Sequence, residues 1–229
     1  MVLTVAYAAQ REWFVKGQLT VPQLPECDEG QYNIMKKRLI LFNKPCRVLS
    51  QFTSKSKHDV LANYISIKKI YAVGRLDYES EGLLLLTNCG ILQHIITDPQ
   101  YKLPKTYWVQ VEGIPSKQAL SQLAKGVNIK GRRTQAAQVS LFSSPPCLWP
   151  RNPPIRQRKF IPTTWMEISI TEGRNRQIRR MTASVGYPTL RLIRYAIGDW
   201  SLDDLQPGQF NEVEFPFEWL KGKQKNGQI

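Results

Sequence analysis

Residues 74–88 read GRLDYESEGLLLLTN, and this stretch decides how the fold is interpreted. One aspartate, Asp77, stands near its start, and an unbroken run of four leucines follows. A short apolar run bounded by polar residues is typical of a buried strand, so we predict one at 83–87 and a second at 70–73. Asp77 would then lie in the loop between two strands, which could point it into a cleft.

Apolar spacing predicts the other elements and an α+β fold. Strands are expected at 38–42, 106–112, 127–130, 136–142, 164–170, 189–197 and 210–215, and helices at 59–65, 90–97, 116–125 and 175–185. Because strands and helices do not alternate strictly, the sheet should be mostly antiparallel. We expect one domain over 38–220, preceded by a loosely ordered extension (1–37) and followed by a frayed tail (221–229).

The positive charge of the chain is concentrated in one stretch. The formal net charge is +14, and residues 130–180 hold eleven basic and two acidic side chains. Such concentration usually indicates contact with a polyanion, because each neutralised phosphate releases condensed counterions. A solvated surface that keeps the protein soluble is the plain alternative. The pattern favours nucleic acid as the partner.

Several classes of protein are disfavoured. The four cysteines are far apart, no C-x-x-C pair occurs, and neither histidine lies near a cysteine, so we expect reduced cytosolic thiols and no metal site. No apolar run reaches the length of a membrane span, and the first residues do not resemble a signal peptide. Nucleotide-binding glycine motifs are also missing. The sequence therefore predicts a cytoplasmic protein.

Asp77 allows two interpretations. Acidic residues are common in turns, and Glu79 and Glu81 stand close by, so Asp77 could be a replaceable, solvated side chain. Alternatively it could be a nucleophile, which must remain ionised while partly desolvated and therefore needs a cationic partner. Arg75 is near in sequence, but we expect the partner to come from elsewhere in the chain.

Two later motifs could complete a site with Asp77. Lys105-Thr-Tyr107 opens a strand in which Tyr107 could be an ordinary strand former or an aromatic platform for a base. The stretch 172–181, EGRNRQIRRM, is the densest cationic patch. On a helix, its arginines at 176, 179 and 180 share one side, and Ile178, Met181 and Val185 form the opposite apolar stripe.

Together these motifs resemble the ribosomal pseudouridine synthases over about residues 38–210. The resemblance implies a sheet of that family's catalytic type, with two closely packed subdomains around a central cleft. It implies that Asp77 attacks a flipped-out uridine of 23S ribosomal RNA through a transient adduct with the ribose or the base. Tyr107 would stack on the uracil and help remove the C5 proton, and Arg179 would form a buried salt bridge with Asp77.

The resemblance also implies a set of substrate-binding residues and a mode of action. The closest branch is the large-subunit synthase E type, because the Asn175-Arg176 pair matches it and residues 1–37 are too short for an S4-type RNA-binding domain. The enzyme would need neither cofactor nor metal, and a monomer is the default. Arg75 would fill the space left by the extruded base, and the basic loop 151–159 would help to select the target. The implied substrate-binding residues are Arg75, Lys105, Arg174, Arg176, Arg180 and Leu192.

Two rival functions remain open at this stage. A non-catalytic RNA-binding or ribosome-assembly protein on the same scaffold would work without Asp77. Another base-flipping enzyme, such as a glycosylase, would release free uracil. A zinc deaminase is disfavoured because its H-x-E and P-C-x-x-C signatures are missing.

Overall fold

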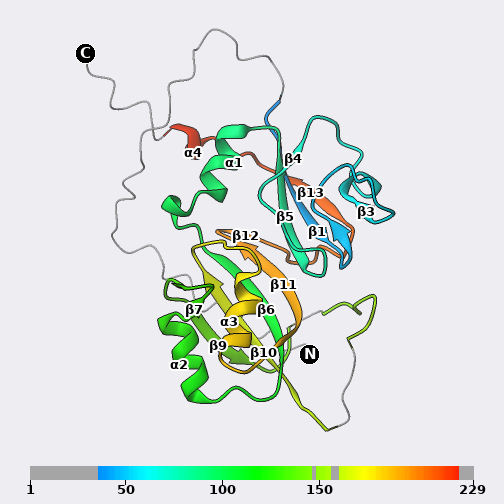
Figure 1. Cartoon of the computed structure of the whole chain (residues 1–229). Coiled ribbons are helices and arrows are strands. Elements are labelled where there is room, and N and C mark those ends of the chain that lie inside the picture. Colours follow the sequence, from blue (N-terminus) through cyan, green and yellow to red (C-terminus); the bar gives the residue numbers. More distant parts are fainter. Residues whose placement is uncertain (1–35, 146–147, 156–159, 222–229) are drawn as a thin grey trace, which may run out of the picture.

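The computed structural model describes residues 36–145, 148–155 and 160–221, which are coloured in Figure 1. The helices are α1 (Gly90–Thr97), α2 (Lys117–Lys125), α3 (Gln177–Ser184) and α4 (Glu218–Lys221). The main sheet contains β1 (Leu39–Lys44), β4 (Tyr71–Ala72), β5 (Glu81–Thr87), β6 (Lys105–Glu112), β9 (Gln138–Phe142), β10 (Thr163–Ile170), β11 (Thr189–Ile197), β12 (Trp200–Ser201) and β13 (Phe210–Val213). Two small ladders pair β2 (Val48–Leu49) with β3 (Asp59–Val60), and β7 (Asn128–Ile129) with β8 (Arg132–Arg133).

The main sheet is continuous but consists of two halves. Its strand order is β13-β1-β5-β11-β6-β10-β9, with β4 beside β5 and β12 beside β11. All of its pairs are antiparallel except β5–β11, which is parallel over a short stretch. Figure 1 shows β13, β1 and β5 in the upper half and β11, β6, β10 and β9 in the lower half. The predicted α+β class with a mostly antiparallel sheet is confirmed.

Three apolar clusters hold the sheet. One face carries a cluster shared by both halves, in which Leu41 and Leu85 are cross-strand partners and Leu92 of α1 packs against them. The opposite face carries a separate cluster in each half. In the upper half Phe42 and its partner Leu84 pack beneath the segment 48–76. In the lower half α2 and α3 cover strands β6, β10 and β11 with their apolar stripes. These two helices therefore lie on the same face of the sheet as the segment 48–76.

Most of the predicted elements are confirmed. The predicted helix at 90–97 is α1, and Ser116 caps α2 by accepting a hydrogen bond from the N–H of Ala119 at 3.2 Å. The predicted helix at 59–65 is wrong, because Asp59–Val60 pair with β2 and only one 3₁₀ turn follows. Four apolar residues at helical spacing are too few to nucleate a helix against a competing strand contact.

Other predictions need smaller corrections. Residues 70–73 form only the two-residue strand β4, and Tyr71 is exposed rather than buried. The predicted strand 127–130 is one arm of the β7–β8 hairpin, whose second arm was not predicted. The expectations for the extension 1–37 and the tail 221–229 fall almost entirely outside the described residues. Within the described ranges, no helix is long and apolar enough to cross a membrane.

Candidate active site at the junction of the two halves

A row of cross-strand neighbours runs through the junction where β5 meets β11. Lys44 of β1 lies opposite Gly82 of β5, Gly82 lies opposite Arg194 of β11, and Arg194 lies opposite Tyr107 of β6. Because paired residues point to the same face, this row joins the two separate clusters described above. Gly82 has no side chain, so Lys44 and Arg194 are both buried beside it. Arg194 Nε donates to the carbonyl oxygen of Leu83 at 2.8 Å.

The Asp77 loop, residues 74–80, lies on this same face. Leu76 packs into the cluster of Phe42 and Leu84, and Ser50 Oγ bonds both the N–H and the carbonyl of Leu76, at 3.0 and 2.9 Å. On the other side of Asp77, the N–H of Arg47 donates to the carbonyl of Tyr78 at 2.7 Å. The backbone before and after Asp77 is therefore held by Ser50 and Arg47, which lie on either side of β2.

Helix α3 approaches the Asp77 loop from the lower half. The residue before it, Arg176, has a φ of 52° in the left-handed region, which costs a non-glycine residue roughly 1–2 kcal/mol. The predicted start at Asn175 is therefore two residues too early. Two buried side chains hold this entry: Gln177 Nε2 donates to Glu172 Oε1 at 2.6 Å, and Gln177 Oε1 accepts from the N–H of Arg174 at 2.9 Å. Strain of this kind is often found at functional sites.

The cation nearest to Asp77 differs from the predicted one. Arg176 Nη1 lies 3.7 Å from Asp77 Oδ2, whereas the predicted salt bridge between Asp77 and Arg179 is not formed between these two described residues. Arg179 instead donates to the carbonyl oxygens of Glu79, at 3.3 Å, and Thr189, at 3.5 Å. Without RNA, the ion pair with Asp77 is therefore made by Arg176, and the pairing of Arg179 with Asp77 stays a prediction.

Arg179 is nevertheless part of the same electrostatic group. Burial and the neighbouring charge of Arg176 lower the pKa of Arg179, while Glu79 and Asp77 act in the opposite direction. Its Nε is buried and has no hydrogen-bond partner among the described residues. Arg179 therefore links α3 to the Asp77 loop through the backbone of Glu79, and its predicted catalytic role stays a prediction.

The carboxylate of Asp77 is available to a substrate. Its side chain is 28% exposed, and the 3.7 Å distance to Arg176 is an ion pair rather than a hydrogen bond. Among the hydrogen bonds between described residues, none ends on its carboxylate oxygens. Its own carbonyl accepts from the N–H of Ser80 at 3.0 Å, which closes the turn. The carboxylate oxygens of Asp77 can therefore still accept contacts from a substrate, while Arg176 lies beside them.

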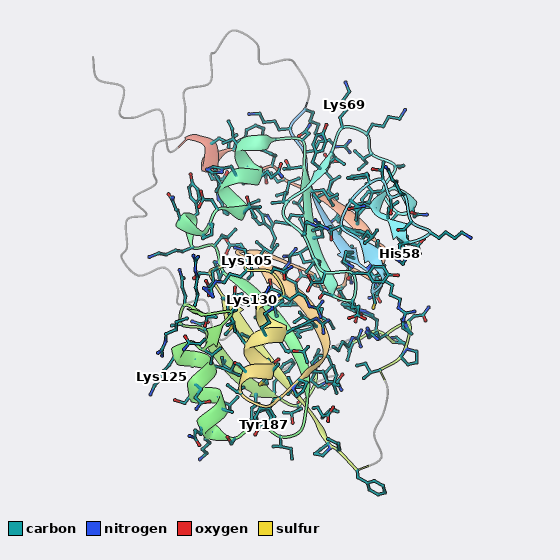
Figure 2. The ribbon with its side chains drawn as sticks, viewed as in Figure 1. His58, Lys69, Lys105, Lys125, Lys130 and Tyr187 are labelled. Carbon is teal, nitrogen blue, oxygen red and sulfur yellow. The ribbon has the colours of Figure 1, made fainter. Side chains whose placement is uncertain are left out.

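Tyr107 and Leu192 lie together beside the junction. Both belong to the lower-half cluster, and Tyr107 is only 8% exposed. Lys105, two residues earlier on β6, is buried, and Figure 2 shows it near the middle of the molecule. Its Nζ donates to the carbonyl of Leu103 at 3.0 Å, and burial lowers its pKa to about 8. The predicted substrate-binding role of Lys105 stays a prediction.

The remaining predicted residues lie around this centre. Arg75 is exposed at the start of the Asp77 loop. Arg174 donates to the carbonyls of Arg132 and Arg133, at 3.3 and 3.2 Å, and so ties the entry of α3 to the β7–β8 hairpin. Arg180 Nη2 donates to Asn175 Oδ1 at 2.8 Å. Arg174 and Arg180 thus flank Arg176 in the sequence, and Arg176 is the residue of this group that pairs with Asp77.

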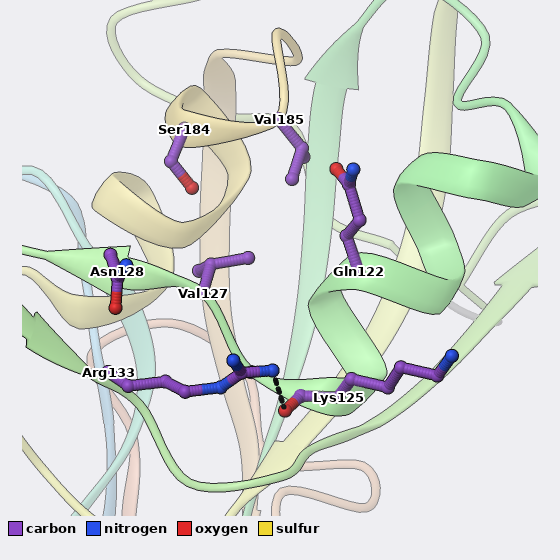
Figure 3. A pocket seen from close by; sticks show the side chains of 8 residues that line it. Gln122, Lys125, Val127, Asn128, Arg133, Ser184 and Val185 are labelled. Atoms are coloured by element: carbon purple, nitrogen blue, oxygen red, sulfur yellow. Dashed lines mark hydrogen bonds between the residues drawn. The ribbon is translucent and has the colours of Figure 1, made fainter.

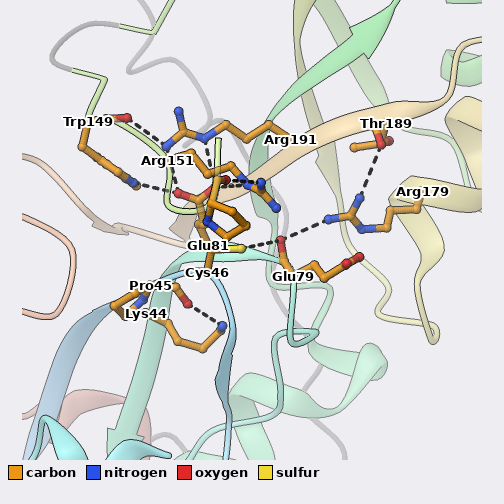
Figure 4. Close-up of polar contacts among 11 residues, drawn as sticks. Lys44, Pro45, Cys46, Glu79, Glu81, Trp149, Arg151, Arg179, Thr189 and Arg191 are labelled. Carbon is orange, nitrogen blue, oxygen red and sulfur yellow. Dashed lines mark hydrogen bonds and ion pairs between the residues drawn. The ribbon is translucent and has the colours of Figure 1, made fainter. Parts of the chain in front are cut away.

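A second group of buried charges was missed by the sequence reasoning. Glu81 follows the Asp77 loop directly and is 1% exposed. Arg191 binds it through two hydrogen bonds, Nε–Oε1 at 2.9 Å and Nη2–Oε2 at 2.8 Å. Trp149 Nε1 donates to Oε2 at 2.8 Å, and Arg151 Nε lies 3.3 Å from Oε1. Figure 4 shows these four residues, here called the Glu81 cluster, beside Cys46, Glu79 and Arg179.

An open hollow of about 370 Å³ lies elsewhere, between the C-terminal ends of α2 and α3 and the β7–β8 hairpin. In Figure 3 Arg133 donates to the carbonyl of Lys125 across it, at 3.3 Å. None of the predicted site residues lines this hollow, so the predicted central cleft at Asp77 stays a prediction. In the described part of the chain, no group of three His, Cys, Asp or Glu side chains could hold a metal ion.

Comparison with known proteins identifies the family. Residues 38–184 match the family described as RNA pseudouridylate synthase. The chain belongs to this family. It is 53% identical to the ribosomal large subunit pseudouridine synthase E of Vibrio parahaemolyticus, over 82% of this chain and 78% of the relative. The synthase of the same name from Xanthomonas campestris is 56% identical, over 75% of this chain and 93% of the relative.

A solved structure supports the fold of this pseudouridine synthase. It is described as a crystal structure of pseudouridylate synthase and is 24% identical in sequence. The TM-score is 0.65, and the match covers 79% of this chain and 72% of the other. The likeness therefore extends over both halves of the sheet.

We expect the stability of this synthase to rise with pH because of Lys44. Burial lowers the pKa of Lys44 to about 8, whereas a lysine in an unfolded chain titrates near about 10.4. Between these values only the unfolded state holds the proton, so raising the pH favours the folded state. Below about pH 8 the cost of the buried charge is fully present.

Urea unfolding of the wild type and of Lys44→Met tests this expectation. From about pH 7.5 to about pH 10, the difference in free energy of unfolding should move by about 2 kcal/mol in favour of the wild type. Lys105 is present in both proteins, so its titration cancels. A difference that does not change with pH would contradict the expectation.

Proposed function

We propose that this protein converts a specific uridine of large-subunit ribosomal RNA to pseudouridine, with Asp77 as the nucleophile. The observation that carries the proposal is the carboxylate of Asp77. It is partly exposed, accepts no hydrogen bond from the described residues, and lies 3.7 Å from Arg176 at the junction of the two halves. Membership of the family supplies the reaction, and this geometry supplies the candidate nucleophile.

The reaction is an isomerisation that conserves all atoms. The bond between N1 of uracil and C1′ of the ribose breaks, and a bond between C5 and C1′ forms. During the reaction Asp77 makes and then breaks an adduct with either the ribose or the base. C5 loses its proton, and N1 gains one. The target nucleotide must leave the base stack to reach Asp77, since a base inside a helix is inaccessible.

Arg176 and Arg179 have different proposed roles. Arg176 orients the carboxylate of Asp77 by direct ion pairing. Arg179 holds the loop through the carbonyl of Glu79. Its predicted salt bridge with Asp77 is proposed for the complex with RNA, because contacts of the free enzyme often change when substrate binds.

The proposed substrate follows from the relatives and from the charge. The relatives at 53% and 56% identity are named as ribosomal large subunit synthases. The basic segment 130–180, which includes Arg176 beside Asp77, carries the positive charge that binding of RNA phosphates requires. A ribosomal RNA substrate implies an enzyme of the cytoplasm.

Mapping of pseudouridine in ribosomal RNA tests the proposal. Unmodified large-subunit RNA is incubated with the purified protein, and pseudouridines are located by carbodiimide labelling. We expect one new labelled position, unchanged RNA mass and no free uracil. Absence of any new position would overturn the proposal, and release of uracil would indicate a glycosylase instead.

Tyr107→Phe separates the stacking role of Tyr107 from its chemical role. The ring that faces a base is kept, whereas the phenolic oxygen that could accept or relay the C5 proton is lost. We expect turnover to fall by about 100-fold with RNA affinity unchanged. Rapid-quench kinetics and filter binding measure the two quantities. Turnover equal to that of the wild type would remove Tyr107 from the proton-transfer step and leave it as packing.

A further inference from the structure

The Glu81 cluster brings three charged side chains together in a buried place. Two guanidinium groups surround a single carboxylate whose side chain is 2% exposed. The side chains of Arg191 and Arg151 are themselves only 5% and 13% exposed. Removing such groups from water costs about as much as their attraction returns, so buried ion pairs seldom exist for stability alone. A positioning role is the more economical explanation.

The Glu81 cluster holds the segment 148–155, which is itself neither helix nor strand. Residues 148–155, all of them described, are irregular. Trp149 donates to Glu81 through Nε1 and accepts from Arg191 Nη2 through its carbonyl, at 3.0 Å. Its ring also lies over the Arg191 guanidinium, 5.6 Å from centroid to Cζ. Arg151 adds its ion pair to Glu81, so this one carboxylate joins β5, β11 and the segment 148–155.

Arg151 lies near the Asp77 loop. Burial raises the pKa of the Cys46 thiol, and the charge of Arg151 opposes that shift. The same charge contributes to the lowered pKa of Arg179, after burial and Arg176. Cys46 Sγ and Arg179 Nη2 both donate to the carbonyl of Glu79, at 3.7 and 3.3 Å. Figure 4 shows Arg151 together with Cys46, Glu79 and Arg179.

Arg151 retains capacity to bind an anion. Its Nη1 donates to the carbonyl of Pro153 at 2.6 Å, and its Nε is buried next to Glu81 without a hydrogen bond of good geometry. Neither contact uses Nη2. The cluster has one positive charge in excess, which favours a phosphate group nearby.

We propose that Glu81 is a positioning residue that holds Arg151 beside the Asp77 loop, where Arg151 binds an RNA phosphate next to the target uridine. The proposal rests on the proposed function, because it assigns a second contact to the same RNA. Glu81 touches no substrate and acts through Arg151. The segment 148–155 is thereby part of the RNA-binding surface.

A double-mutant cycle on the full-length protein tests this proposal. Arg151→Ala should raise KM for unmodified large-subunit RNA about tenfold, change kcat by no more than about twofold, and lower the salt slope of RNA binding by about 1. Glu81→Gln should raise KM similarly, since Arg151 is no longer held. The double variant should be no worse than Arg151→Ala, because the two residues act as one unit. Arg38→Ala, which removes a remote arginine–glutamate pair with Glu212, is the control and should leave KM unchanged.

Each outcome decides the proposal. An unchanged KM for Arg151→Ala overturns it, and KM effects of the two variants that multiply overturn the link through Glu81. If Glu81→Gln does not fold, Trp149→Phe replaces it, since this change removes one bond to Glu81 and keeps the pair with Arg191. We then expect a smaller rise in KM, and an unchanged KM contradicts the positioning role. Failure of the wild type to form pseudouridine would instead refute the proposed function.

Discussion

Asp77→Asn should abolish pseudouridine formation, with a loss of at least about 10⁴-fold in rate. An amide has no negative charge and cannot form the adduct, although its shape is almost the same. RNA affinity should remain within a fewfold of the wild type, because Arg174, Arg176 and Arg180 are kept. Single-turnover conversion of unmodified large-subunit RNA measures the rate, and filter binding measures the affinity.

Asp204→Asn is the matched control for this prediction. Asp204 is an exposed aspartate in the connection between β12 and β13, and the substitution makes the same chemical change. We expect wild-type activity from it. If Asp77→Asn remained active, Asp77 could not be the nucleophile, and a non-catalytic RNA-binding role would become the better account of the protein.

Gly82→Ala should destabilise the protein by about 4 kcal/mol or more, which is exceptional for the addition of one methyl group. Gly82 has a φ of 104°, and a Cβ built there would lie 2.4 Å from the carbonyl oxygen of Arg194 and 2.8 Å from its N. Both obstacles are backbone atoms, so relief requires β5 and β11 to separate. Since this pair is the joint between the halves, activity should fall together with stability.

Gly90→Ala is the control for Gly82→Ala, because it adds the same methyl group at a glycine with open space around it. Gly90 begins α1, and a Cβ there would meet no atom within 4 Å. Alanine favours a helix over glycine by up to about 1 kcal/mol, so stability should stay the same or rise slightly. Urea unfolding of both variants and the wild type gives the free energies. Equal stability of the two variants would show that the contact between β5 and β11 at Gly82 is not tight.

The sequence was sufficient for the elements whose apolar pattern reflects local structure. Helix α1 begins and ends where its spacing predicted, and β6 and β11 differ from prediction by no more than one residue at each end. The family motifs also led to Asp77, and the basic stretch led to RNA. In these cases each residue type is explained by its immediate neighbours or by a familiar motif.

The sequence was insufficient where contacts cross between the halves. A left-handed residue at Arg176 cannot be read from a helical pattern, yet it decides which arginine meets Asp77. Glu81 is followed at once by an apolar run, and its burial needed partners more than 65 residues away that no motif indicates. A glutamate at the start of a buried strand was the one available signal, because a buried carboxylate requires a cation.

The strand order also determines when a newly made chain can first become active. β1 lies between β5 and β13, and the row that includes Lys44 and Gly82 is completed by Arg194, more than 100 residues later. Contacts so distant in sequence form slowly, and the ribosome delivers the chain from its N-terminal end. Asp77 and its loop therefore emerge long before α3 and β11 exist to meet them. A nascent chain stays inactive until its last strands have left the ribosome.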